Sequence, residues 1–402
     1  MDCAPQSINS VLGLDLILEI LDCLAVPLCF HQRTCNLPVL AACSLVCKAW
    51  STHAQRLLFR RVLIPHNIYT EPHRRATTRN TLPSLLAAID PATERGRVLA
   101  TCVLSLTVRH TGRGRTPDAS ALATAILRLP NLRHLDVTTI SCAFDRETLD
   151  LLRAEGPRIT ALSVEQDFAP SDAQHARIMH QLVASFPSVR LLEITSNLNR
   201  MLPPFDPPPR LALVSVKFNT MFLRDIGPCL ASLMRPPSGA VDTEPLQVLC
   251  HKSHVTNPSS LGGVLDAHGA RLRSLSVKTP DPGPGAAQSP LAQCTQLERF
   301  ELGRFPDEDT LASIPRSITA LAISGAPARG ALDFEAFTGQ LAIGTFPHLR
   351  ALTWSLFPAG LTPLEELERI CARQGINLRT PPGEAYDDNA VEVELRRKYI
   401  RI

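Results

Sequence analysis

The feature that most constrains this chain is a short apolar pattern that recurs along residues 97–379. Each copy has a leucine, two variable residues, a second leucine, one variable residue and then a valine or a similar side chain, and ten copies can be aligned. Because side chains alternate between the two faces of a strand, the second and third apolar positions point to one side. The recurrence therefore predicts one short strand per repeat, stacked in parallel, with return segments on the outside.

The copies are separated by roughly 20 to 35 residues, close to the spacing of leucine-rich repeats. The fifth copy is aligned from Leu211, and the sixth ends on a polar residue, His251. Proline-rich stretches at 203–209 and 280–290 are expected to be surface loops. The predicted fold class is α/β, with an irregular leucine-rich repeat solenoid and a curved parallel sheet. The middle apolar positions are Leu106, Leu135, Leu162, Leu192, Val214, Leu249, Leu275, Phe300, Leu321 and Leu352.

Residues beside the middle apolar position point away from the core and are expected to line the concave face. Lys217, Lys252 and Lys278 are expected to form one column on three successive strands about 4.8 Å apart. Like charges at that spacing repel, so this column is expected to receive an acidic or phosphorylated segment of a substrate; an ordinary solvated face is the alternative. The candidate substrate-binding residues of the concave face are Arg109, Asp136, Glu165, Glu193, Lys217, Lys252, Lys278 and Glu301.

Residues 10–64 carry a different, helical periodicity. The run LDLILEIL at 14–21 predicts one amphipathic helix, a second is expected from Pro38 to Trp50, and a third over 51–58. Three helices in so short a segment form a marginal core. The module is therefore expected to bury apolar surface on a partner or on the following repeats.

Residues 43–50 read CSLVCKAW, and residues 58–61 read LFRR. These stretches resemble the F-box proteins, in which an adaptor-docking helical module precedes a substrate-binding array. The opening differs, because Gly13 stands where the family usually has proline. The resemblance implies a Skp-type adaptor, a cullin scaffold and a protein substrate, and it implies no catalytic residue in this chain. The adaptor-binding residues implied are Leu12, Leu16, Ile20, Leu45, Val46 and Trp50.

Two alternatives stand beside this interpretation. The three helices could serve only to cap the repeats, and the whole chain could be a leucine-rich repeat scaffold or inhibitor that never joins a ligase. Residues 65–96 are expected to link module and repeats, with a short helix at 82–89. The segment 380–402 is expected either to form a helical cap on the final repeat or to be disordered.

Composition narrows the remaining classes of function. A net charge of +3 without a clustered basic face gives no expectation of nucleic-acid binding. No stretch reaches the roughly 18 apolar residues of a membrane helix. The twelve cysteines lie mostly within or beside apolar segments, which favours buried reduced thiols and a location in the cytoplasm or nucleus.

No catalytic motif or cofactor-binding motif is recognisable, so a non-enzymatic function without cofactors is expected. Cys250, His251 and His254 offer three potential zinc ligands within a short stretch. Zinc sites normally use four protein ligands, or three and a water, and packing is the preferred explanation for these residues. No metal site is predicted.

Overall fold

The computed structural model describes residues 14–25, 37–66, 81–110, 119–138, 144–166, 172–196, 209, 211–220, 227–234, 244–252, 259–277, 290–303, 306, 308–324, 334–355, 364–380 and 390–400. The chain divides into two compact units. The first comprises Met1–Ile159 with Arg397–Ile402, and the second comprises Thr160–Arg396. Within the described residues, no helix is both long and apolar enough to cross a membrane.

The first described elements of the first unit are the helices α2 (Leu14–Ala25), α3 (Leu37–Cys43) and α4 (Lys48–Arg60). Their small core has Ile17 and Leu21 from α2, Leu40 from α3 and Leu57 from α4. The partly buried side chains of Cys43, Trp50 and Leu58 pack against this core.

The second predicted helix is interrupted, so the prediction of one helix from Pro38 to Trp50 is wrong. After Cys43 the chain makes a tight turn, in which the Leu45 amide donates to the Ala42 carbonyl at 3.0 Å and the Val46 amide to the Cys43 carbonyl at 3.2 Å. Cys47 then has an extended backbone, with φ −158° and ψ 167°, and precedes α4. Trp50 therefore belongs to the first turn of α4.

The rest of the first unit alternates strands and helices. Its strands β1, β2 and β3 pair in parallel in chain order. Helix α5 begins at Leu82, where the Thr81 hydroxyl accepts a hydrogen bond from the Ser84 amide at 3.2 Å, as expected of an N-cap. The elements are β1 (Arg61–His66), α5 (Leu82–Ala88), α6 (Glu94–Cys102), β2 (Ser105–His110), α7 (Ala119–Leu127), β3 (His134–Thr138) and α8 (Arg146–Glu155).

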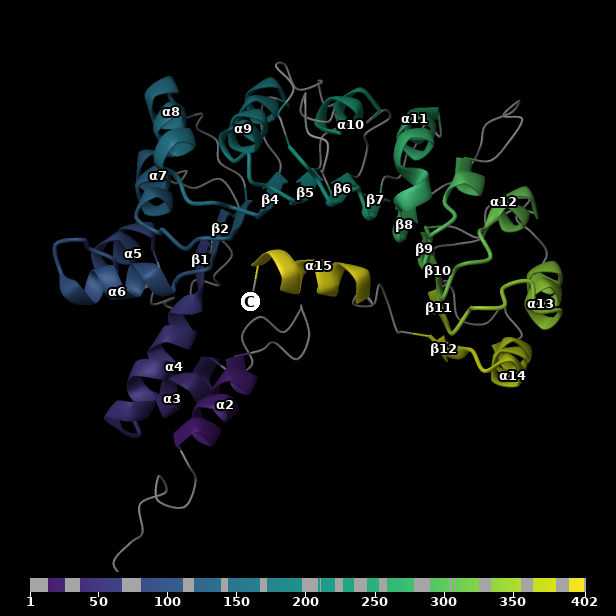
Figure 1. Ribbon diagram of the computed structural model, residues 1–402, viewed down its shortest axis with the longest axis horizontal. Helices are drawn as coiled ribbons and strands as arrows, with labels where there is room; N and C mark the ends of the chain where they lie inside the picture. The colour runs from purple at the N-terminus through teal and green to yellow at the C-terminus, as the bar shows by residue number, and fades with distance from the viewer. Residues whose placement is uncertain are drawn as a thin grey trace, which may run out of the picture. The chain divides into compact units, whose positions relative to one another are not determined.

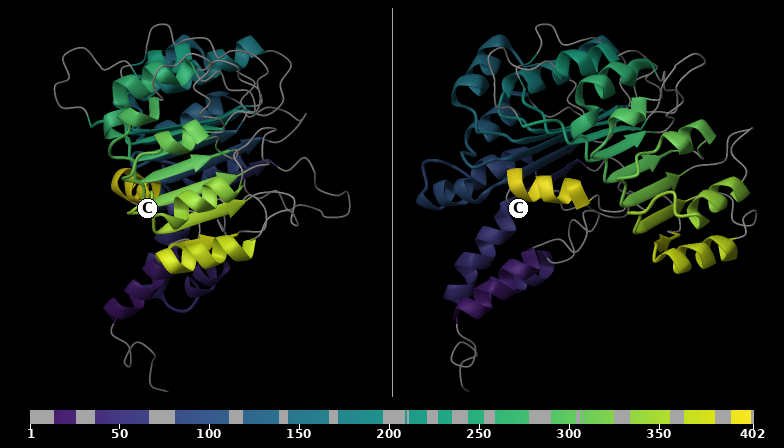
Figure 2. Two further views of the ribbon diagram at one scale, coloured as in Figure 1. Left: turned by 90° about the vertical axis from the view of Figure 1, so that its right-hand side faces the viewer. Right: turned by 45° about the vertical axis from the view of Figure 1, so that its right-hand side comes forward.

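The second unit repeats the same arrangement along the strands β4 to β12, which pair in parallel with their neighbours in chain order. Figures 1 and 2 show α9 to α14 on the outer side of these strands and the yellow helix α15 on the opposite, inner side. The strands are β4 (Ala161–Gln166), β5 (Leu191–Ser196), β6 (Ser215–Thr220), β7 (Val248–Lys252), β8 (Ser274–Val277), β9 (Arg299–Leu302), β10 (Ala320–Ser324), β11 (Ala351–Ser355) and β12 (Asn377–Arg379). The helices are α9 (Asp172–Ser185), α10 (Gly227–Leu233), α11 (Ser259–His268), η1 (Gly269–Arg271), η2 (Pro290–Gln293), α12 (Glu308–Ser313), α13 (Phe334–Ala342), α14 (Leu364–Gln374) and α15 (Ala390–Ile400).

One backbone arrangement fixes the phase of the repeats. The carbonyl of the residue just before a strand accepts hydrogen bonds from two successive amides of the next repeat. The Arg190 carbonyl accepts from Val214 and Ser215 at 2.8 and 3.1 Å, and the Val214 carbonyl accepts from Gln247 and Val248 at 2.8 and 3.1 Å. Val214 is thus equivalent to Arg190 and Gln247, and it precedes strand β6.

The predicted alignment of the fifth copy is therefore wrong by two residues. Val216 occupies the middle apolar position, flanked by Leu213 and Phe218, and all three are buried. The structure pairs Lys217 with Cys250 and Asn219 with Lys252 across β6 and β7. The three lysines do not form the expected column, and Lys278 lies outside the described residues. The reason is the two-residue period of a strand: a shift by two keeps every side chain on its face, so periodicity cannot detect it.

The other predicted middle apolar positions are buried, and so is the polar ending of the sixth copy, His251, which is 1% exposed. Val164, the third apolar position of the third copy, is only partly buried. Strand β1 precedes the ten predicted copies, and β12 follows them. The strands thus begin earlier than the predicted start of the repeats at residue 97, whereas β12 ends at Arg379, the predicted C-terminal limit.

Candidate functional site

Five exposed apolar side chains lie on the N-terminal module. Among the described large apolar side chains, Leu16 of α2 is 46% exposed, Ile20 of α2 is 45% exposed and Val39 of α3 is 44% exposed. In the turn between α3 and α4, Leu45 is 86% exposed and Val46 is 56% exposed. We call these five side chains the apolar surface. Exposed apolar groups gathered on one small module are typical of protein-binding surfaces.

The helical and turn geometry explains this exposure. On α2, Ile17 and Leu21 point into the core, so Leu16 and Ile20 lie on the neighbouring stripe of the helix. The turn after α3 carries Leu45 and Val46 away from the core. Of the remaining predicted adaptor-binding residues, Trp50 packs against the core, and Leu12 lies outside the described residues.

In the first unit, two of the predicted concave-face residues come together. Arg109 of β2 and Asp136 of β3 form an ion pair, with Nη2 and Oδ2 3.9 Å apart. Asp136 is buried, and Thr107 donates a hydrogen bond to it at 3.4 Å. These two strands thus satisfy one another's charges.

In the second unit, the sheet register places Glu193 of β5 beside Lys217 of β6. Both side chains are engaged by helix α15. Lys217 forms an ion pair with Glu392, and Arg396 donates from Nη2 to Oε2 of Glu193 at 3.2 Å. Arg396 also donates from Nε to Oε1 of Glu392 at 2.8 Å. Four charged groups from two strands and one helix therefore form a continuous chain of ion pairs.

These side chains are largely removed from water. The side chains of Glu392 and Arg396 are 15% and 20% exposed. Burial by itself would raise the pKa of Glu392, but Lys217 and Arg396 lower the pKa of this carboxyl to about 2. Burial opposes the charge of Arg396, yet Glu392 and Glu193 raise the pKa of its guanidinium above the ordinary value. Each charge thus depends on its partners.

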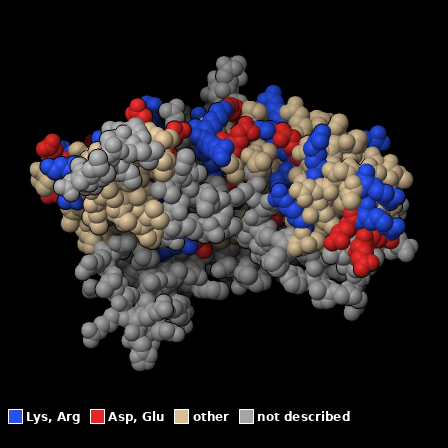
Figure 3. Space-filling model, turned by 90° about the horizontal axis from the view of Figure 1, so that it is seen from below, with Lys and Arg blue, Asp and Glu red and all other residues tan. Residues whose placement is uncertain are grey.

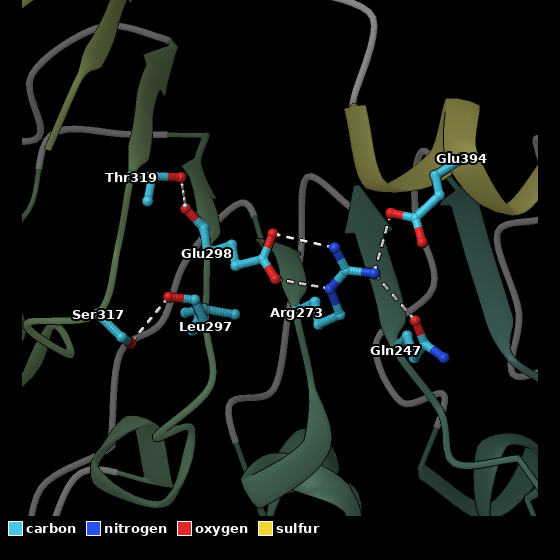
Figure 4. A network of polar contacts seen from close by, with 7 residues as sticks. All are labelled: Gln247, Arg273, Leu297, Glu298, Ser317, Thr319 and Glu394. Atoms are coloured by element: carbon cyan, nitrogen blue, oxygen red, sulfur yellow. Dashed lines mark hydrogen bonds and ion pairs between the residues drawn. The ribbon is translucent and has the colours of Figure 1, made fainter. Parts of the chain in front are cut away.

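A second contact joins α15 to the position just before β8 (Figure 4). Arg273 lies between two neighbouring repeats, bonding Glu298 through Nε at 2.6 Å and Nη2 at 3.2 Å. Its Nη1 reaches Gln247 at 3.4 Å and Glu394 of α15 at 3.1 Å. Hydrogen bonding and charge from Glu298 raise the pKa of Arg273. The fork fixes this guanidinium in place, with one nitrogen directed at α15.

The remaining predicted substrate-binding residues are distributed along the same strands. Glu165 of β4 stands in register with Thr195 of β5. Glu301 of β9 accepts a hydrogen bond from the Ser276 hydroxyl at 3.0 Å. Lys252 has its backbone in β7, while its side chain lies outside what the structure describes.

Sequence reasoning missed Arg273, Gln247 and Glu298, which follow the first leucine of their copies. A usable signal was present, because the same position holds Arg190 in the fourth copy and Arg350 in the tenth. A polar residue recurring at one repeat position predicts a ladder between neighbouring strands. The contacts of α15 had no comparable signal.

The described surface carries charges of both signs. In Figure 3, basic and acidic side chains of the described residues are interspersed. Within the described part of the chain, no group of three or more histidine, cysteine, aspartate or glutamate residues is placed to hold a metal ion. His251 is buried, and neither ring nitrogen has a hydrogen-bond partner among the described residues; burial lowers its pKa to about 4. His254 lies outside the described residues.

Comparison with known proteins adds little to this geometry. No family model matches the sequence, and no curated protein matches it. Among solved structures, the crystal structure of a TLR13–ssRNA13 complex is similar with a TM-score of 0.38 and 14% sequence identity. The match covers 68% of this chain and 36% of that chain. By its own strands and return helices, the repeat region is a leucine-rich-repeat-like solenoid, an architecture suited to binding.

Proposed function

We propose that this protein is the substrate-recognition subunit of a cullin-type ubiquitin ligase. In this proposal the N-terminal module binds a Skp-type adaptor, and the repeats bind a protein substrate. The observation that carries it is the exposure of Leu45 and Val46 inside the stretch at 43–50 that resembles an F-box. If these two side chains were buried in the module, they could not contact an adaptor.

The apolar surface supports docking on energetic grounds. Fully burying one leucine or valine side chain is worth about 1.5–3 kcal/mol. Leu45, Val46, Leu16 and Ile20 are all available for such burial, whereas Trp50 supports the helices that present them. Leu12, outside the described residues, belongs to the same proposal.

The proposed contribution to ubiquitin transfer is proximity. A receptor that holds a substrate near a loaded enzyme raises the effective concentration of the target lysines and needs no catalytic group of its own. The described cysteines are free thiols, which agrees with a working location in the cytoplasm or nucleus. In this proposal, binding of substrate is assigned to the repeats.

Co-expression of the full chain with a Skp-type adaptor tests the proposal. The wild-type chain is expected to co-purify as a one-to-one complex in size-exclusion chromatography. Leu45→Asp is expected to weaken binding by roughly 10- to 100-fold, as loss of a central apolar contact does. Ile343→Asp is the matched control, because Ile343 is 76% exposed and lies outside the module.

Circular dichroism of each variant separates loss of binding from loss of fold. Absence of a complex with the well-folded wild-type chain would contradict adaptor docking. The protein would then be better described as a leucine-rich repeat scaffold or inhibitor that is not attached to a ligase.

A further inference from the structure

The inner side of the second unit has a ligand-like segment lying on it. Residues 390–396 of α15 face β5, β6 and the position before β8 through three separate charge contacts, at Glu193, Lys217 and Arg273. The nearest preceding strand, β12, ends at Arg379. These charge contacts of α15 are thus made with earlier repeats, which differs from the expected helical cap on the final repeat.

The helix depends on those contacts. An isolated helix as short as α15, with eleven residues, is marginal in water. Its Glu392 and Arg396 are one turn apart, so both can face the sheet, and Val391 and Leu395 on adjoining positions are buried. The two carboxylates and one guanidinium of the helix are thus each paired with an opposite charge, at Lys217, Arg273 and Glu193.

We propose that the surface formed by Glu193, Lys217 and Arg273 binds a helical segment of a partner protein, and that α15 occupies this surface as an internal competitor. The partner segment carries acidic residues at two positions, equivalent to Glu392 and Glu394, and a basic residue equivalent to Arg396. This proposal names a substrate class for the proposed function. Only the identification of the partner as a ligase substrate rests on that function.

The charge order favours a protein helix over a polyanion. Lys217 and Arg273 suit carboxylates, but Glu193 requires a cation, and Arg396 supplies it at 3.2 Å. A phosphate backbone would place further negative charge beside Glu193. Like charges in close contact are destabilising, so such a ligand is disfavoured at this surface. The surface is therefore selective for a segment that carries both signs.

The internal helix sets the affinity that a partner must reach. A segment tethered by a short connection acts at an effective concentration of about 1 mM. A partner segment that makes the same contacts binds only when α15 leaves the surface. Release of α15 therefore raises the observed affinity of the surface for the partner segment. Any change that weakens the ion pairs of Glu392 or Arg396 is therefore expected to release α15 and to make the surface available to a partner.

A labelled peptide with the sequence of residues 388–402 provides the probe. Its binding is measured by fluorescence anisotropy to the full wild-type chain and to a full-length double variant, Glu392→Ala with Arg396→Ala. The double variant is expected to bind the peptide at least about 10-fold more tightly, because the internal copy no longer competes. Equal affinity for the two chains would overturn the proposal, as would no binding to the double variant up to about 1 mM peptide.

Charge exchange tests the pairing itself. Adding Lys217→Glu to the double variant is expected to weaken peptide binding by at least about 10-fold, and a peptide with Glu392→Lys is expected to recover it. A peptide with Arg397→Ala is the matched control, because Arg397 is an exposed arginine on the same helix, and it is expected to bind like the original. Failure of recovery, or displacement of the peptide by equimolar single-stranded RNA, would overturn the assignment.

These measurements use no adaptor, so their outcome is independent of adaptor docking. A chain that binds the peptide but not the adaptor would retain the internal competitor and lose the ligase function. If the chain binds the adaptor but not the peptide, the ligase function stands and the internal competitor is refuted.

Discussion

Arg396 donates a hydrogen bond to Glu193 at 3.2 Å across a sequence separation of 203 residues. The same guanidinium bonds Glu392 within its own helix at 2.8 Å, and Glu392 is paired with Lys217. Arg396 thus links α15 directly to β5, and its partner Glu392 links the same helix to the neighbouring strand β6. Helix α15 is a structural part of the inner face, and the strands below it have their charges matched by it.

Arg396→Ala is expected to destabilise the docked state of α15 by about 1–3 kcal/mol, because two largely buried carboxylates lose a partner. Hydrogen exchange of the α15 amides measures this as increased local opening. Arg397→Ala removes the same type of charge from an exposed position and is expected to change opening by less than about 0.5 kcal/mol. Similar effects from the two variants would contradict the assigned contacts.

His251→Leu is expected to stabilise the protein by about 1–3 kcal/mol at neutral pH, because it replaces a buried polar ring that lacks hydrogen bonds. Leucine suits the position, since Val277 of β8 stands in register with His251. Urea unfolding of wild type and variant at pH 7.5 measures the difference. A destabilised variant would show that the imidazole has a partner.

The same histidine predicts a pH dependence. Burial lowers the folded-state pKa of His251 from 6.5 to about 4, so the unfolded state binds more protons between these values. The stability is therefore complete above pH 6.5 and falls as the pH decreases towards 4, by about 2 kcal/mol at pH 5. This part of the acid sensitivity is expected to be missing in His251→Leu, and equal pH dependence in both proteins would refute the interpretation.

Arg273 and Glu298 form a forked pair whose side chains are 27% and 42% exposed. Solvent screening limits such pairs, so a double-mutant cycle with Arg273→Ala and Glu298→Ala is expected to give a coupling of about 0.5–1 kcal/mol. Thermal or urea unfolding of the four proteins measures it. A coupling near zero would show that the fork contributes no net stability to this repeat interface.

Trp50 and Leu45 are only a few residues apart but are expected to behave differently. Trp50→Ala removes a ring that packs against the core of the module and is expected to lower the stability of the module by about 2–4 kcal/mol. Leu45→Ala changes a side chain that is 86% exposed and is expected to leave stability within about 0.5 kcal/mol. Circular dichroism during urea unfolding distinguishes the two, and a large loss in Leu45→Ala would argue against a free surface.

The core of the repeats could be predicted from the sequence because burial there repeats with the strand period. Positions such as Leu106, Phe300 and Trp354 are buried as the pattern requires. The period could not fix the alignment of β6, where Leu211 and Leu213 lie two residues apart on the same face. The strand register and the backbone hydrogen bonds of Val214 to the neighbouring repeats distinguish the two alignments.

The inner-face contacts could be predicted only in part. The sequence identified Glu193 and Lys217 as facing residues, but it gave no means of knowing that Glu392 would lie beside Lys217. Contacts between segments so distant in sequence depend on where the chain returns, and no local periodicity encodes this. The break in the helix after Cys43 was missed because the local pattern is misleading there. Leu45 and Val46 continue the apolar helical pattern, but both are exposed in a turn.

The central claim is that the protein has two separate binding surfaces, one for an adaptor and one for a helical partner segment. Hydrogen exchange of the full chain, measured alone, with a Skp-type adaptor and with the 388–402 peptide, tests it most directly. The adaptor is expected to slow exchange around residues 44–50 and to leave α15 unchanged, whereas excess peptide is expected to speed exchange in α15 and to leave residues 44–50 unchanged. Unaltered exchange at residues 44–50 with a saturating amount of adaptor would contradict the claim.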